Sequence, residues 1–273
     1  MLLAVGAATD QGRVRPNNED QYALFLEPGL PLGVRAILVV ADGMGGYQAG
    51  EVVSGLVISA FADWLRSGVA ERIALPSDLP GLLVQVIEDA NQRIFTAASR
   101  DARLRGMGTT VVAAAITDGR VVLAHVGDSR AYLIENANIY QLTRDHSWIA
   151  EQVRAGLLTH AEARRHPRRN VLTRAVGIAA TVSVETGTFE IGDGDTLLLC
   201  TDGLTSLIAD QDILRIAGRI PDPRRAARAL VDLANQRGSP DNVTVVIARV
   251  GSAGTSAPED GDQTIEDVRG SRR

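Results

Sequence analysis

Lysine is absent from this sequence. All 28 basic side chains among its 273 residues are arginine. The absence excludes the phosphate-binding lysine of Walker-type nucleotide sites, the strand lysine of protein kinases and catalysis through a lysine Schiff base. We attribute the bias to a GC-rich genome rather than to function.

Cysteine is nearly absent as well. The single Cys200 lies in the apolar run 197–200 and can form no intramolecular disulfide, which suits a reducing compartment. Long apolar runs are missing too: no segment reaches about 18 uninterrupted apolar residues, and no basic region precedes the short apolar stretch at the N-terminus. The sequence therefore predicts a cytoplasmic protein without a membrane segment.

The chain also lacks an excess of positive charge. Its net charge is −5 and its pI is near 5.4, which argues against general nucleic-acid binding. The apolar content of 45% is ample for a core. The length fits one large domain or two small ones.

Apolar periodicity predicts a chain rich in both strands and helices. The expected strands span 3–9, 21–26, 36–41, 109–116, 120–126, 130–134, 139–142, 182–189, 196–201 and 243–250. The expected long helices span 49–65, 79–104, 210–219 and 223–236, the last with Asp222 as N-cap. Hairpin turns at 117–120 and 135–138 make the middle portion antiparallel.

Two segments differ from this pattern. Residues 143–177 change to short helices, with a capping box from Thr159 to Glu162, and we expect an inserted, partly mobile subdomain there. Four arginines cluster in it, at positions 164, 165, 168 and 169, and two interpretations are open: a solvated helix face, or a surface that steers acidic or phosphorylated substrates. Beyond Gly251 the chain is polar and acidic, so residues 251–273 are predicted to form a disordered tail.

One carboxylate follows a strand that is predicted to be buried on both faces. Residues 36–41 form an apolar run, and Asp42 comes next, at the start of the glycine-rich segment 43–46. Glycines let a backbone turn sharply and approach an ion closely. An Asp-Gly pair after a strand is most often only a turn, so this motif alone does not identify a site.

Acidic residues recur beside other predicted strand ends. The segments are 18–20, 127–130, 201–203 and 239–242. A sheet that aligned the neighbouring apolar runs would bring these carboxylates together, and cations would relieve their repulsion. An all-oxygen set without His or Cys at ligand spacing favours Mg²⁺ or Mn²⁺ over Zn²⁺. Two such ions can activate water and clamp a phosphoryl group, for which Arg15 offers a bidentate fork.

The four histidines are dispersed along the chain. We expect His125 to face the interior of a strand. We expect His146, His160 and His166 to be exposed in the inserted segment rather than to bind a metal.

These motifs resemble those of a known family, the metal-dependent serine/threonine protein phosphatases of type 2C in their bacterial form. The resemblance covers residues 4–250 and rests on six blocks in family order. The blocks are Arg15-Pro16-Asn17-Asn18-Glu19-Asp20, Ala41-Asp42-Gly43-Met44-Gly45-Gly46, Gly106-Met107-Gly108-Thr109-Thr110, Val126-Gly127-Asp128-Ser129-Arg130, Thr201-Asp202-Gly203-Leu204 and Asp241-Asn242-Val243-Thr244.

The resemblance implies an α+β fold: a four-layer α-β-β-α sandwich of two antiparallel sheets flanked by helices. It implies one phosphatase domain over residues 1–250, with a flap at about 143–177. It also implies hydrolysis of phosphoserine and phosphothreonine in proteins, without a phosphoenzyme, by water activated at two Mn²⁺ or Mg²⁺ ions. Phosphorylated proteins would be the substrates, and a bacterial serine/threonine kinase of the same cell would be the partner.

The resemblance further assigns roles to single residues. Asp42 would bridge two metals, the Gly43 carbonyl would bind the second, and Asp202 with Asp241 would complete the shell of the first. Asp20 and Glu19 would act at the second metal, partly through water. Asp128, together with Asp202, would bind a weaker third metal. Arg15 would bind the substrate phosphate, and Asn242 would support Asp241.

One position departs from animal members of this family, which place a His two residues after the bridging Asp as a proposed general acid. Here that position is Met44. The proton donor is therefore unassigned, and we hypothesise that a metal-bound water protonates the leaving oxygen.

Two other functions are compatible with the fold. A catalytically idle module that binds phosphoproteins would be expected to have lost metal carboxylates, and none is lost here. A stress-response regulator phosphatase usually carries a sensor or coiled-coil domain, for which 273 residues leave no room.

Overall fold

The computed structural model describes residues 2–31, 33–45, 49–67, 78–101, 104 and 106–251. Gly46, Gly68 and the predicted tail from residue 252 onward lie outside these described residues. None of the helices in the described part of the chain is long and apolar enough to cross a membrane.

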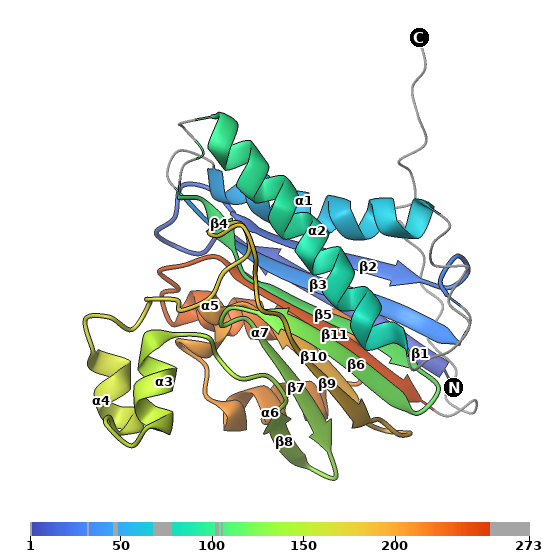
Figure 1. Cartoon of the computed structure of the whole chain (residues 1–273). Coiled ribbons are helices and arrows are strands. Elements are labelled where there is room, and N and C mark those ends of the chain that lie inside the picture. Colours follow the sequence, from blue (N-terminus) through green and yellow to red (C-terminus); the bar gives the residue numbers. More distant parts are fainter. Residues whose placement is uncertain are drawn as a thin grey trace.

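Two antiparallel sheets form the centre of the molecule (Figure 1). The first has the order β1 (Leu2–Asp10), β11 (Val243–Gly251), β10 (Thr196–Cys200), β7 (Arg130–Glu135) and β8 (Asn138–Gln141). The second has the order β2 (Asp20–Leu26), β3 (Val34–Met44), β5 (Val111–Thr117), β6 (Arg120–Val126) and β9 (Glu185–Glu190), and the short β4 (Gly108–Thr109) pairs with the end of β3.

Helices cover the outer face of each sheet. The second sheet is covered by α1 (Ala49–Arg66) and α2 (Leu79–Arg100), and the first by α5 (Asp202–Thr205), α6 (Asp210–Arg219) and α7 (Pro223–Gln236). Three buried apolar clusters result, one under each helical layer and one between the sheets. The predicted four-layer α-β-β-α sandwich is thus confirmed.

The centre of the second sheet shows why the sandwich forms. Residues 36–41 of β3 are completely buried, as their unbroken apolar run predicts. Ile37 and Val39 pack toward α1 and α2, whereas Leu38 and Val40 pack into the cluster between the sheets. Each such side chain contributes about 1.5–3 kcal/mol through burial.

Several predicted element boundaries were wrong. The structure continues β3 through Gly43 and Met44, which pair with Thr109 and Gly108, so Asp42 lies within a strand rather than at the start of a turn. The β4 segment supplies hydrogen-bond partners that extend this strand, and the sequence of β3 alone does not reveal them. The helix expected over 79–104 ends at Arg100, and the strand expected from 182 begins at Glu185.

The predicted helix caps are confirmed. The Thr159 hydroxyl accepts from the Glu162 N–H, and the Glu162 carboxylate accepts from the backbone N–H of Thr159. The Asp222 carboxylate accepts from two backbone N–H groups of α7. Residues 143–177 contain α3 (Trp148–Arg154) and α4 (His160–Arg165), which lie beside one end of the sandwich in Figure 1.

Candidate metal centre

The register of the second sheet places two predicted metal ligands opposite each other. Asp20 begins β2 and is the cross-strand partner of Asp42 in β3. Directly opposed residues of an antiparallel pair have Cβ atoms only about 4.5–5.5 Å apart. Two carboxylates therefore meet at this end of the sheet.

Asp20 is held from the other sheet. Its Oδ2 accepts hydrogen bonds from the hydroxyls of Thr201 (2.9 Å) and Thr244 (2.7 Å). Its Oδ1 is buried and has no hydrogen-bond partner among the residues that the structure describes. Sequence reasoning gave these two threonines no role, although Thr244 interrupts the apolar run of β11 and Thr201 directly precedes Asp202.

The first sheet brings Asp202 and Asp241 to the same end. Asp202 begins α5 directly after β10, and Asp241 comes just before β11, which pairs with β10. Gly203 allows the two segments to meet, because a Cβ at this position would lie 1.9 Å from the Asn242 carbonyl oxygen. The predicted turn after β10 is thus a short helix.

Asn242 supports the loop beside Asp241. Its Oδ1 accepts from the Glu19 N–H at 2.8 Å, and its Nδ2 donates to the carbonyls of Gln11 and Asn17 at 2.9 and 2.8 Å. The side chain therefore connects the segment before β11 to the Arg- and Asn-rich loop.

Glu19 and Gly43 lie beside the start of α1. The Gly43 N–H donates to the Glu19 carbonyl at 3.2 Å, and the Ser54 hydroxyl of α1 donates to the same oxygen at 2.7 Å. A Cβ on Gly50 would lie 2.5 Å from the Glu19 carboxyl carbon. Glu19 is therefore fitted against the first turn of α1, where the helix dipole favours negative charge.

The turn after β6 carries Asp128. Gly127 has φ +105°, and a Cβ there would approach the Thr110 side chain to 2.6 Å. The Thr110 hydroxyl accepts from the Asp42 N–H at 3.1 Å and lies 2.7 Å from the Ser129 hydroxyl. A hydrogen-bond chain therefore joins the turn that carries Asp128 to the strand that carries Asp42.

Mutual repulsion and burial perturb these acids. Burial, and then the charges of Asp20, Asp202, Asp128 and Asp241, raise the pKa of Asp42 well above its usual value. Burial also raises the pKa of Asp20 to about 7 and that of Asp202 to about 6. The same cause, with the charge of Asp202, raises the pKa of Asp128.

Two arginines border the cluster. Arg15 Nη2 lies 2.8 Å from Asp241 Oδ2, and both side chains are partly exposed. Arg130 binds Asp145 through a bidentate pair, with contacts of 2.9 and 2.7 Å, and its charge lowers the pKa of Asp128 and Asp202. The Arg130–Asp145 pair was not predicted from the sequence.

The donor set fits a hard divalent cation. It consists of carboxylates, one of which has a buried oxygen with no partner in the described part of the chain, and repulsion within it favours uptake of positive charge. The structure thus brings together the aspartates predicted as ligands.

A second group of potential ligands lies next to the turn that carries Asp128, and the sequence did not reveal it. The ligand atoms of His125, His146 and Glu185 lie within 4.8 Å of one another. His125 is buried, as predicted, but the expectation that His146 is exposed was wrong, because only 2% of it is exposed. It was misassigned because the segment 143–147 packs on β6, a contact between residues about 20 positions apart.

Comparison with known proteins gives consistent matches. A family model described as "Protein phosphatase 2C" matches residues 15–236. The serine/threonine phosphatase stp of Listeria innocua is 37% identical over 239 residues, which is 88% of this chain and 92% of that protein.

Solved structures are similar along nearly the whole chain. The serine/threonine phosphatase Stp1 from Staphylococcus aureus matches with a TM-score of 0.84 and 34% identity, over 92% of this chain and 96% of that one. The catalytic domain of the phosphatase PstP, solved in complex with 2 manganese ions, matches with a TM-score of 0.78 and 35% identity, over 92% and 99%.

Proposed function

This chain belongs to the protein phosphatase 2C family and is a serine/threonine protein phosphatase, and we propose that the carboxylates at one end of its sandwich hold the divalent ions that this hydrolysis requires. The observation that carries the proposal is the opposition of Asp20 and Asp42, with one oxygen of Asp20 unpartnered among the described residues. The charges of three further aspartates, Asp202, Asp128 and Asp241, act on Asp42.

The proposed ligands come from both sheets. Asp42, Asp202 and Asp241 would hold one ion, and Asp42 with Asp20, Glu19 and the Gly43 carbonyl would hold a second. Asp128, together with Asp202, would hold a weaker third ion. The proposed number of two tighter ions equals the 2 manganese ions in the similar PstP structure. We propose Mn²⁺ or Mg²⁺ because all donor atoms are oxygens.

When bound, such ions lower the pKa of a water molecule and neutralise charge on the phosphoryl group. The protein contributes position and charge. Arg15 binds the phosphate oxygens, since its guanidinium is partly exposed at the edge of the cluster and can form two parallel hydrogen bonds. Asn242 fixes the segment that carries Asp241.

No covalent phosphoenzyme is proposed. The available acids are committed to the metal site, and Cys200 is buried in β10, where burial raises the pKa of its thiol to about 12. A thiol in that environment is not nucleophilic at neutral pH.

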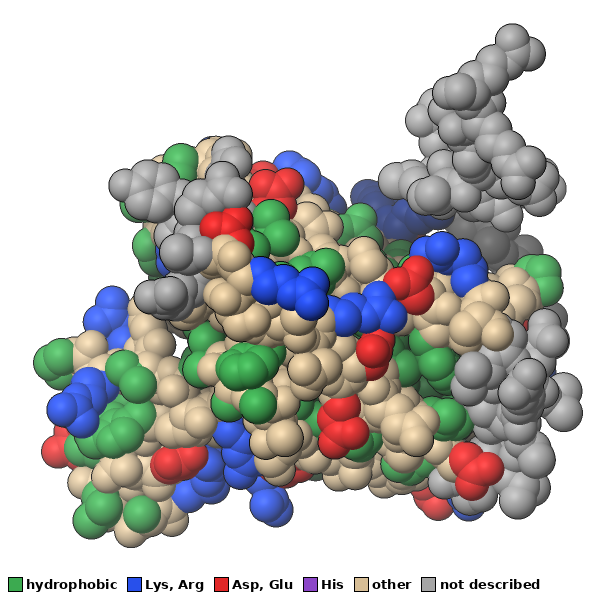
Figure 2. Space-filling view, turned by 45° about the horizontal axis from the view of Figure 1, so that its top comes forward, with side chains coloured by type: hydrophobic (Ala, Val, Ile, Leu, Met, Phe, Trp, Pro, Cys, Tyr) green, Lys and Arg blue, Asp and Glu red, His purple; other side chains and the backbone are tan. Residues whose placement is uncertain are grey.

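The substrates are phosphorylated proteins, and we propose that they dock beside the flap of residues 143–177. Figure 2 shows basic, acidic and apolar side chains interspersed on the part of the surface where α3 and α4 lie in Figure 1. Arg165, Arg168 and Arg169 are exposed there, and so are Leu157 and Val171. A serine/threonine kinase of the same cell would supply these substrates.

The proposal is tested with Asp42→Asn and Asp202→Asn. Phosphate release from a phosphothreonine peptide is measured with Mn²⁺ and with chelator, and Mn²⁺ binding is measured by calorimetry. We expect both variants to lose Mn²⁺-dependent release and to bind fewer ions. Asp232→Asn, on the exposed face of α7, is the matched control and should behave as the parent.

Unchanged release in both variants would overturn the ligand assignment. A parent that binds Mn²⁺ but releases no phosphate would favour the alternative of an idle phosphoprotein-binding module.

A further inference from the structure

His146 is bonded to the turn that carries Asp128 from two directions. The backbone N–H of His146 donates to the Gly127 carbonyl at 2.9 Å, and the backbone N–H of Gly127 donates to the ring Nδ1 of His146 at 3.1 Å. Both groups of Gly127 are thereby engaged by one residue of another segment. The imidazole ring is buried, so water does not compete for the bond.

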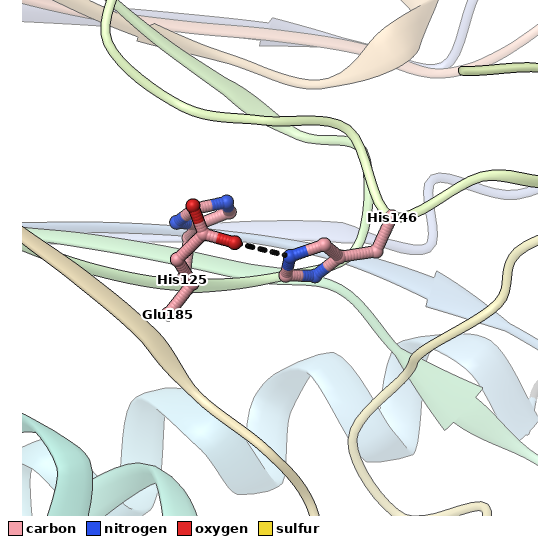
Figure 3. Close-up of side chains that lie close together, drawn as sticks. All are labelled: His125, His146 and Glu185. Carbon is pink, nitrogen blue, oxygen red and sulfur yellow. Dashed lines mark hydrogen bonds and ion pairs between the residues drawn. The ribbon is translucent and has the colours of Figure 1, made fainter. Parts of the chain in front are cut away.

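The other side of the ring is fixed by two residues of the sheet (Figure 3). His125 in β6 and Glu185 in β9 are cross-strand partners, and His146 contacts both. Its ring stacks on that of His125, with centroids 4.8 Å apart and planes 13° apart, while its Nε2 lies 3.2 Å from Glu185 Oε2. His125 Nε2 in turn lies 3.0 Å from the Arg144 carbonyl oxygen.

This geometry indicates a hydrogen-bonded clamp rather than a metal site. The lone pairs of an imidazole lie in its plane, so two stacked rings direct them side by side and not toward one ion. His146 Nδ1 accepts from an N–H, so the proton of the neutral ring is on Nε2 and is donated to Glu185. The Arg174 guanidinium, 3.3 Å from the same Nε2, would also repel a cation.

The clamped turn is one that the chain cannot easily hold otherwise. Gly127 has φ +105°, in a region that side chains disfavour, and Asp128 follows it directly. The charge of Asp202 acts on Asp128, so a small rotation of the turn would change the spacing of this pair.

We propose that His146 is a positioning residue, which holds the Gly127–Asp128 turn through its Nδ1 and so fixes the position of the Asp128 carboxylate. This inference rests on the proposed function of Asp128 as a ligand of the weaker third ion. It adds to the site a residue that touches neither substrate nor metal. Partners that orient a ligand are commonly worth 10-fold to 100-fold in metal affinity.

A matched pair of variants separates the two ring nitrogens. In His146→Asn the side-chain oxygen can take the place of Nδ1 and accept from Gly127, whereas in His146→Gln the amide nitrogen can take the place of Nε2 and donate to Glu185. Both variants remove the ring and its stacking on His125. Because the Asn side chain is one methylene shorter than that of Gln, a role in packing alone would affect His146→Asn at least as much as His146→Gln.

Mn²⁺ binding to the full chain is measured by calorimetry beside phosphate release and the melting temperature. We expect His146→Gln to weaken the Asp128-dependent binding step by about 10-fold to 100-fold and His146→Asn to retain it. Asp128→Asn should weaken the same step. The tighter steps, which depend on Asp42, should survive in both. Equal losses in both variants, or none in His146→Gln, would overturn the proposal.

A measurement on the parent protein covers the case in which His146→Gln does not fold. Mg²⁺ is diamagnetic, so the resonances of the Gly127 amide and of His146 Nδ1 can be followed as the weak step saturates. Both should shift with that step, and resonances that shift only with the tight steps would overturn the clamp. Failure of Asp42→Asn to reduce binding would instead contradict the proposed function.

Discussion

Arg15 and Asp241 form an ion pair of 2.8 Å between the loop before β2 and the segment before β11. One residue is the proposed phosphate anchor and the other a proposed metal ligand. The pair holds the guanidinium at the edge of the carboxylate cluster, where the charges of Glu19 and Asp42 also act on Arg15. A phosphate that binds Arg15 is therefore brought next to the proposed ions.

Arg15→Lys should raise KM for a phosphothreonine peptide about 10-fold while leaving Mn²⁺ binding close to that of the parent. Lysine keeps the charge but loses the planar fork that binds two oxygens, a loss on the order of 1–2 kcal/mol. Steady-state kinetics with saturating Mn²⁺ tests this. Arg228→Lys on α7 is the control, and an unchanged KM in Arg15→Lys would remove Arg15 from substrate binding.

The metal-free protein should become less stable as pH rises from 6.5 to 8. Burial raises the pKa of Asp20 to about 7, so the folded protein binds protons that the unfolded chain, with an ordinary aspartate pKa, has released. One carboxyl group with that pKa lowers the free energy of unfolding of the protein by on the order of 1 kcal/mol over this interval. Below about pH 6.5 the buried His125 and His146, whose pKa values are lowered, act in the opposite direction.

Urea unfolding in chelator at several pH values measures this slope. Asp20→Asn should make this slope shallower but not remove it, because the pKa values of Asp42 and Asp128 are raised as well. Saturating Mn²⁺ should abolish or reverse the slope, because ions bind the deprotonated carboxylates. A stability in chelator that is constant from pH 6.5 to 8 would contradict the raised pKa.

Gly203→Ala should destabilise the fold by about 1–3 kcal/mol, because the new Cβ would meet a backbone carbonyl that cannot move without shifting Asp241. Gly218→Ala in α6 is the matched control. Its Cβ would meet no atom within 4 Å, so the helix should gain about 0.5–1 kcal/mol. Thermal unfolding of both variants checks the prediction, and equal melting temperatures would refute the close approach.

Charge reversal on the flap should separate protein substrates from small ones. Arg165→Glu with Arg169→Glu should raise KM for a phosphoprotein severalfold and spare a small aryl phosphate, since only the large substrate reaches these exposed side chains. Arg168 is retained because its guanidinium lies 5.2 Å from the centroid of the Trp148 ring. The same reversal of Arg225 and Arg228 on α7 is the control, and matching KM changes in both pairs would indicate a general charge effect.

The chemistry of the site could be predicted from residues adjacent in sequence, and its supports could not. Asp42, Asp128, Asp202 and Asp241 each stand next to a strong apolar run, so their gathering follows once those runs pair. The hydroxyls of Thr201 and Thr244 bind Asp20 from more than 180 positions away, and no local pattern indicates such a contact. His146 was predicted to be exposed for the same reason.

By itself, the sequence determined most strands and helices, the antiparallel hairpins, the helix caps and an all-oxygen set of candidate ligands, because these depend on apolar periodicity and on interactions within a few residues. The four-layer arrangement was implied only by the resemblance to a known family. Only the tertiary structure decided that Asp20 lies opposite Asp42, that β3 runs through Gly43, and that His146 clamps Gly127. Those relationships depend on strand register and on packing between distant segments, where a shift of one residue would turn each side chain to the opposite face.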